Sequence, residues 1–135
     1  MAEKQVQVQN KLEVVKNFLK DLDLPIDVEA ENGIIVIEAN PKYVASAIYN
    51  DGNAHLLIRD RDSGDYETVL ISLSNDGVYV YPMSKPSRTE KKELCSKYPD
   101  VCSKYEEKRL FAKLRVVEMM YNEDIIRVVA EVVNG

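Results

Sequence analysis

The residues best suited to nucleophilic or metal chemistry are one histidine and two cysteines. His55 is the only imidazole, and Cys95 and Cys102 lie seven positions apart, each at the start of a Cys-Ser-Lys-Tyr repeat. A catalytic thiol–imidazole pair needs a third group to orient the ring, and no local signature of that kind surrounds these residues. Their spacing is also not that of a zinc site. We therefore predict a protein that is not an enzyme, with no catalytic, cofactor or metal-binding residues.

Two further patterns resemble reactive sites but have simpler interpretations. On one straight helix the Cα atoms of Cys95 and Cys102 would lie about 10 Å apart, which is too far for a disulfide. A bridge would require a turn at Pro99, so the sequence favours two free thiols. The run Arg-Asp-Arg-Asp at 59–62, followed by Asp65, lacks the ligand spacing and terminal glutamate of a calcium loop. It indicates a solvated turn.

Tyrosine is the aromatic residue that recurs in the predicted sheet. Strand alternation places five of them on one face: Tyr43, Tyr49, Tyr66, Tyr79 and Tyr81. Such a face could stack nucleic acid bases, but residues 1–83 carry 7 basic against 14 acidic side chains, a net charge of −7 that repels phosphate. A protein-contact face fits better, since tyrosine is enriched at interfaces. The alternative that the chain's own C-terminal helices cover this face stays open.

The C-terminal part is the only basic part of the chain. Residues 84–135 carry 11 basic against 9 acidic side chains, a net charge of +2. Nucleic acid binding would therefore have to use the segment 85–115, and the candidate contacts are Lys85, Arg88, Lys91 and Lys92. Glutamates interspersed at helical spacing favour an ion-paired, solvated helix face instead. A nucleic-acid-associated regulatory factor is thus the alternative function.

Length and composition predict one folded domain over residues 1–135. Hydrophobic residues make up 45% and charged residues 30% of the chain, a balance that excludes a disordered protein. The first ten residues, MAEKQVQVQN, lack the features of a secretory signal, and no apolar run reaches the length of a membrane span. We therefore expect a cytoplasmic, acidic protein with no membrane contact.

The N-terminal part, residues 1–24, predicts a helix from about Val6 to Leu24. Its apolar residues recur at steps of four and three, which is the pattern of one buried helix face, and they are Val8, Leu12, Val15, Leu19 and Leu22. Val14 and Phe18 widen this face. Pro25 ends the helix, because it disfavours helical geometry in the residue before it.

Residues 25–83 predict an antiparallel meander of five or six strands. The apolar period changes to two, and glycine follows Asn, Asp or Ser at four turn signals: Asn32-Gly33, Asp51-Gly52, Ser63-Gly64 and Asp76-Gly77. The predicted strands cover about 26–31, 34–39, 43–49, 54–60, 66–74 and 78–82. Asn40-Pro41 predicts a corner between the second and third strands. Alternation assigns Val44 and Ile48 to the core face and their neighbours to the tyrosine-bearing face.

Residues 84–135 predict a helical region. Ser87 and Glu90 form a capping box for a short helix from Arg88 to Lys97. A longer apolar stripe then continues at steps of four and three through Leu110, Leu114, Val117, Tyr121, Ile125, Val128 and Val132. An unbroken helix of that length would be about 50 Å long, more than a compact domain of this size measures. It must therefore bend near Asn122 or pack on another chain.

Together these patterns predict an α+β fold: a five- to six-stranded antiparallel meander sheet, an N-terminal helix and long C-terminal helices. The predicted function is a non-catalytic protein–protein interaction or adaptor module that forms a homodimer through its long C-terminal helix. The predicted contact residues are Tyr43, Tyr49, Tyr79, Tyr81, Leu114, Val117, Tyr121 and Ile125. The sequence does not name the partner protein.

Overall fold

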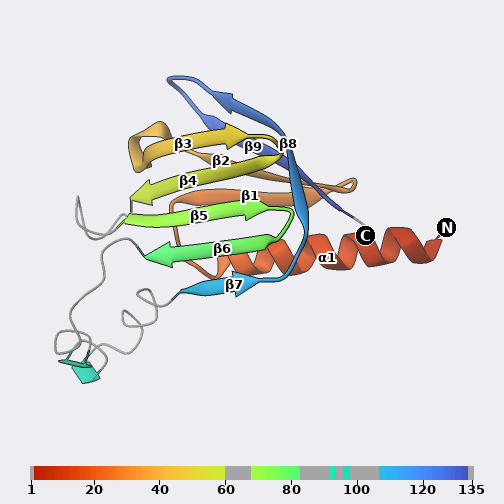
Figure 1. Cartoon of the computed structure of the whole chain (residues 1–135), viewed down its shortest axis with the longest axis horizontal. Helices are drawn as coiled ribbons and strands as arrows, with labels where there is room; N and C mark the ends of the chain where they lie inside the picture. The colour runs from red at the N-terminus through yellow and green to blue at the C-terminus, as the bar shows by residue number, and fades with distance from the viewer. Residues whose placement is uncertain (1, 60–67, 83–91, 94–95, 98–106, 134–135) are drawn as a thin grey trace.

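The computed structural model describes residues 2–59, 68–82, 92–93, 96–97 and 107–133, and these residues fold as two antiparallel sheets with one long helix (Figure 1). The elements in chain order are α1 (Ala2–Lys20), β1 (Ile26–Glu31), β2 (Ile34–Ala39), the 3-10 helix η1 (Pro41–Tyr43), β3 (Val44–Asn50), β4 (Asn53–Arg59), β5 (Thr68–Ser74), β6 (Gly77–Pro82), β7 (Lys108–Leu110), β8 (Leu114–Tyr121) and β9 (Ile126–Val132).

The long C-terminal helices predicted for residues 84–135 are absent from the described residues. The stretch 107–133 instead forms the strands β7, β8 and β9. The long C-terminal helix is therefore wrong as a dimer interface, while the homodimer itself stays an untested prediction. Most of the predicted helix at 88–97, its capping box and both cysteines lie outside the described residues.

The prediction of a single meander sheet is also wrong. One sheet has four strands in the order β1-β2-β9-β8, and the other has five in the order β3-β4-β5-β6-β7. The predicted strand positions in residues 26–82 are close to those observed. However, β1 and β2 belong to the four-stranded sheet together with β8 and β9. The corner predicted at Asn40-Pro41 is η1, where the Asn40 side chain accepts a hydrogen bond from the Lys42 N–H at 2.9 Å. It carries the chain from one sheet to the other.

Two predicted hairpin turns have the backbone geometry that their residue types allow. Asn32 and Gly33 have φ angles of 54° and 80°, and Asp51 and Gly52 have φ angles of 50° and 83°. Positive φ at both central residues is the condition for the tight hairpin turn that matches strand twist, and Asn, Asp and Gly tolerate it at low cost. The turn predicted at Ser63-Gly64 lies outside the described residues.

The hydrophobic core lies between the two sheets and against α1. Alternate residues of the four-stranded sheet face inward and are buried, among them Val28, Ile35, Ile37, Leu114, Val116, Ile126 and Val128. The five-stranded sheet contributes Leu56, Ile58, Ile71, Leu73, Val78 and Val80. These side chains form one cluster, as expected for two packed sheets whose inner faces interdigitate.

Helix α1 closes one of the two open sides between the sheets. It runs along the side where β1 is the outer strand, and Leu12, Val15 and Leu19 from its predicted apolar face are fully buried (Figure 1). Full burial of such side chains stabilises the fold by about 1.5–3 kcal/mol each. The helix ends at Lys20, and Asp23 follows with φ of 52°, so the chain has already turned before Pro25. No helix in the described part of the chain combines the length and apolarity needed to cross a bilayer.

Gly77 occupies a position that no other residue type fits. Its φ is 141°, and an added Cβ would lie 2.7 Å from the Leu110 carbonyl oxygen of β7. We expect Gly77→Ala to lower the free energy of unfolding by about 1–3 kcal/mol, because both the backbone and this contact would be strained. Gly33→Ala is the control, since its positive φ costs about 1 kcal/mol but no atom lies within 4 Å of the new Cβ. Equal losses for both variants in urea denaturation would contradict the steric explanation.

Candidate protein-contact surface

Exposed apolar side chains concentrate on the second open side of the sandwich. Seven large apolar side chains are exposed among the described residues, and four of them belong to β3 and β8. They are Ile48, Tyr49, Val117 and Tyr121, with 45% to 61% of each side chain accessible to solvent. We call these four residues the edge patch.

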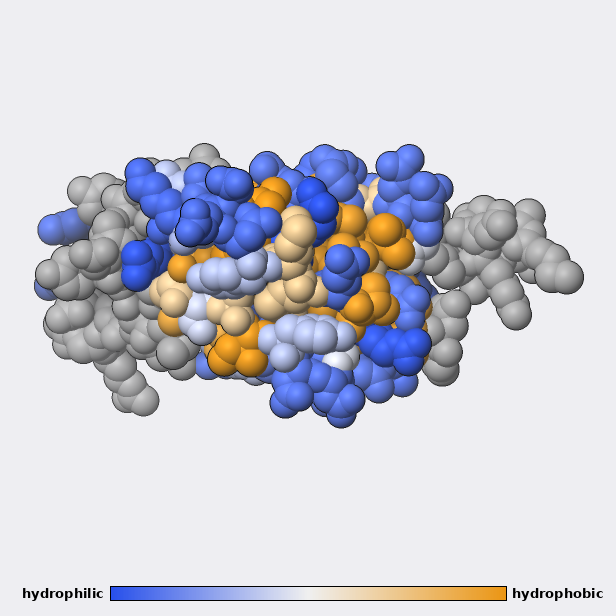
Figure 2. All heavy atoms as spheres, turned by 90° about the horizontal axis from the view of Figure 1, so that it is seen from above, coloured by the Kyte–Doolittle hydropathy of each residue, from blue (hydrophilic) through white to orange (hydrophobic). Residues whose placement is uncertain are grey.

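The edge patch lies on this side because β3 and β8 are outer strands. β3 ends the five-stranded sheet and β8 ends the four-stranded sheet, so neither has a partner strand on its outer side in the described part of the chain. Figure 2 looks onto this side and shows apolar and weakly polar residues gathered in the middle, with charged residues around them. An exposed apolar area with a polar rim is typical of a surface that contacts another molecule.

Two hydrogen bonds join the β3–β4 hairpin to β8 of the other sheet. The Val116 N–H of β8 donates to the Gly52 carbonyl oxygen at 2.8 Å. The Tyr49 hydroxyl donates to the Val116 carbonyl oxygen at 3.2 Å. Both backbone groups of Val116 are therefore satisfied by the other sheet, which fixes the relative position of β3 and β8.

Both edge strands contain a β-bulge, and the bulges determine which side chains reach the surface. In β3, Val44 pairs with Ile58 but Ser46 pairs with Leu57, so one extra residue lies between them. In β8 the pairing shifts between Val116 and Glu118, which leaves Val117 as the extra residue. A bulge reverses the alternation beyond it. This is why Ile48, which alternation had placed in the core, lies on the outer face of the five-stranded sheet opposite His55, while Tyr49 lies on the other face of β3 opposite Ala54.

The residues predicted to form one protein interface lie in four different places. Tyr49, Val117 and Tyr121 are exposed on the outer strands β3 and β8, whereas Leu114 is fully buried in the core. Tyr43 and Ile125 line a hollow at one end of the molecule, and Tyr79 and Tyr81 lie half-buried on the outer face of the five-stranded sheet.

Ile48 is the exposed apolar residue of β3 that sequence reasoning missed. Its type suits either face of a strand, and strict alternation from Val44 placed it inside. Only the register shift after Val44 moves it to the surface, and no residue near that position, such as a glycine, marks a bulge in the sequence.

The outer face of the five-stranded sheet carries a cluster of rings around one cation. The Tyr79 and Tyr81 rings are parallel, with centroids 6.0 Å apart. The Arg109 guanidinium lies 4.5 Å from the Tyr79 ring centroid and 4.3 Å from that of Phe111. His55 is on the same face, opposite Ser72 on the neighbouring strand. The rings and the arginine in this arrangement make cation–π contacts.

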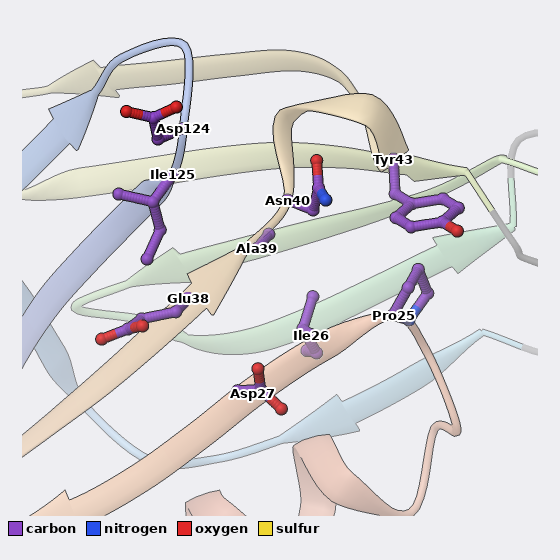
Figure 3. A pocket seen from close by; sticks show the side chains of 9 residues that line it. All are labelled: Pro25, Ile26, Asp27, Glu38, Ala39, Asn40, Tyr43, Asp124 and Ile125. Atoms are coloured by element: carbon purple, nitrogen blue, oxygen red, sulfur yellow. The ribbon is translucent and has the colours of Figure 1, made fainter.

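A hollow of about 400 Å³ at one end of the sandwich is acidic. Asp27, Glu38 and Asp124 line it together with Asn40 and Tyr43, but the three carboxylates point in different directions (Figure 3). Glu38 also forms an ion pair with Arg127 at 3.2 Å. No group of three or more metal-ligating side chains occurs among the described residues. The hollow therefore lacks the converging ligands of a metal site.

The residues predicted for nucleic acid binding are almost entirely outside the described part of the chain. Lys85, Arg88 and Lys91 fall there, and Lys92 is described and exposed. Comparisons of the chain with protein-family models, with curated proteins and with solved structures gave no match.

The hydrogen bond from the Tyr49 hydroxyl should stabilise the packing of β3 against β8. We expect Tyr49→Phe to lower the free energy of unfolding by about 1 kcal/mol, because the Val116 carbonyl would lose a hydrogen bond in a partly buried position. Tyr121→Phe is the matched control, since this more exposed ring has no hydrogen bond from its hydroxyl to the described residues. Chemical denaturation of both variants tests the difference. A loss of similar size for Tyr121→Phe would show that the Tyr49 bond has no special role.

Proposed function

We propose that this chain is a non-catalytic protein-interaction module that contacts another protein through the edge patch. The observation that carries the proposal is that four exposed large apolar side chains belong to the outer strands β3 and β8, namely Ile48, Tyr49, Val117 and Tyr121. Burying apolar area of this kind is the main source of free energy in protein association, and tyrosine is enriched in such contacts.

The two bulges favour contact through side chains over addition of a strand. A partner strand that extends a sheet needs a regular row of unpaired N–H and C=O groups. Bulges interrupt that row, and proteins use them to protect exposed sheet edges from unwanted pairing. In β8 the N–H and C=O of Val116 are also occupied by Gly52 and Tyr49. The partner therefore packs on the exposed side chains.

The residue types of the edge patch indicate the polarity and charge of a surface that could pack on it. None of its four residues carries a charge, and the nearby Arg115 is already paired with Glu131 at 3.0 Å. A complementary surface should thus be apolar at its centre with polar groups only at its rim, as in most specific interfaces. A second copy of this chain and a different protein both meet that requirement, and the two are separated by measuring the mass in solution.

The nucleic acid alternative receives no specific support from the described residues. The net charge of −5 opposes phosphate binding, and the edge patch adds no cation to the contact surface. We therefore do not propose it as a second function.

The double variant Ile48→Lys/Val117→Lys tests the proposal. Both side chains are solvent-exposed, so the fold should be retained, whereas two charges in the contact area would have to be desolvated on binding. We expect proteins captured from the native cells, or self-association seen by light scattering, to be lost with this variant.

The control variant is Ile34→Lys, which places the same charge at an exposed apolar position on β2 in the four-stranded sheet. Binding or dimer formation should persist with Ile34→Lys. The proposal fails if the wild-type protein is monomeric and captures nothing, or if the patch variant and the control lose the same partners.

A further inference from the structure

A second exposed apolar area lies on the opposite open side, in a groove beside α1. The groove has a volume of about 370 Å³ and is lined by Asn10, Lys11, Val14, Leu110, Phe111, Ala112, Lys113, Val132 and Val133. Phe111 is the most exposed large apolar residue in the described part of the chain, at 78%, and Val14 is 52% exposed. The sequence predicted Val14 to be part of the apolar face of the helix. The described elements therefore leave Val14 partly uncovered.

The walls of the groove come from three separate parts of the chain. Val14 and Lys11 lie on α1, Phe111 lies in the connection between β7 and β8, and Val133 follows β9. The Val133 N–H donates to the Lys113 carbonyl oxygen at 2.9 Å, which holds the last two of these segments together. The groove is thus built on fixed backbone, as a docking site requires.

The charge of the groove is opposite to that of the protein. The chain has 23 acidic and 18 basic residues, yet among the described residues the charged ones that line the groove are Lys11 and Lys113. Neither lysine forms an ion pair with a carboxylate in the described part of the chain. An occupant that is apolar and also negatively charged would satisfy both the groove lining and its two cations.

Arg109 adds a third cation next to the groove. Its guanidinium lies 4.3 Å from the ring centroid of Phe111 and 4.5 Å from that of Tyr79. Stacking holds the planar group in place, and its N–H groups at the edge stay available for a carboxylate. No ion pair joins Arg109 to a carboxylate among the described residues. An acidic side chain of an occupant that packs on Phe111 would therefore meet an oriented guanidinium.

We infer that this groove binds a short acidic segment of another protein, in which an apolar side chain packs on Val14 and Phe111 and neighbouring carboxylates contact Lys11, Lys113 and Arg109. The groove is open and concave, so it accepts a protruding side chain. An anionic membrane surface fits less well, because Lys11 and Lys113 line a hollow that a broad, flat surface does not enter. The site is distinct from the edge patch and does not depend on the function proposed for it.

Selection from a phage library of random dodecapeptides on the full chain tests this inference. We expect the enriched peptides to carry net negative charge and a leucine or an aromatic anchor. One enriched peptide, made synthetically, should bind at least about tenfold more weakly to Phe111→Ser and to Lys11→Gln/Lys113→Gln, because each variant removes a central contact. Its affinity should also fall as salt is raised.

Matched variants identify the site. Lys42→Gln removes an exposed lysine that lies over the Tyr43 ring, near the acidic hollow, and should leave peptide affinity unchanged. The edge-patch variant Ile48→Lys/Val117→Lys should also bind the peptide normally, so a failure of the proposed function would not affect this result. Phe111 is too exposed for its replacement to prevent folding.

Three results would overturn the inference. They are the absence of enriched peptides, enrichment of neutral or basic peptides, and equal affinity of the peptide for the wild-type protein and both groove variants. Vesicles of phosphatidylserine and phosphatidylcholine supply a further comparison. If they bind the protein, and the groove variants abolish that binding while peptides show none, the occupant is a membrane surface and the inference is wrong.

Discussion

The pairing of β9 with β2 is the contact on which the rest of the structure depends. β9 lies inside the four-stranded sheet, between β2 and β8, and the ion pair from Arg127 to Glu38 joins residues that are 89 positions apart in sequence. Without β9, the β1–β2 hairpin would be a two-stranded ribbon and β8 would have no partner strand. Isolated hairpins are marginally stable in water. The N-terminal hairpin therefore acquires its sheet only when the C-terminal strands reach it, which makes the fold rich in non-local contacts.

Local features of the sequence predicted local structure well. The apolar stripe of α1 is buried at Leu12, Val15 and Leu19, and the Asn-Gly and Asp-Gly signals mark hairpin turns with positive φ at Asn32 and Asp51. These features depend on neighbouring residues alone. The division into two sheets depends on which strand pairs with which, and strand composition does not specify the pairing. Nothing in the sequence near η1 shows that the chain leaves one sheet for another.

The C-terminal stretch misled the prediction for a physical reason. Its apolar residues recur every three or four positions because the Val117 bulge inserts an extra residue into β8 and the turn after Tyr121 separates two strands. Asn122, near which a bend was predicted, is a residue type that also caps helices. Its side chain does accept hydrogen bonds from the N–H groups of Asp124 and Ile125, at 2.8 Å and 2.9 Å, but in a turn between strands. The same Asx geometry serves both structures, so the residue type does not distinguish them. The abundance of β-branched residues was the more reliable indicator.

The two candidate contact surfaces follow from the geometry of a two-sheet sandwich. Stacked sheets leave two open sides, and a side is closed only where some element lies across it. α1 covers one side but leaves Val14 and Phe111 beside a groove, and on the other side Tyr49 and Gly52 form hydrogen bonds with Val116 of β8. The bulges in β3 and β8 interrupt the row of backbone N–H and C=O groups that another strand would pair with. Apolar side chains on these strands can therefore stay exposed with less risk of aggregation. An edge protected in this way can retain an apolar contact area, because the bulges that block strand addition leave the side chains free to pack.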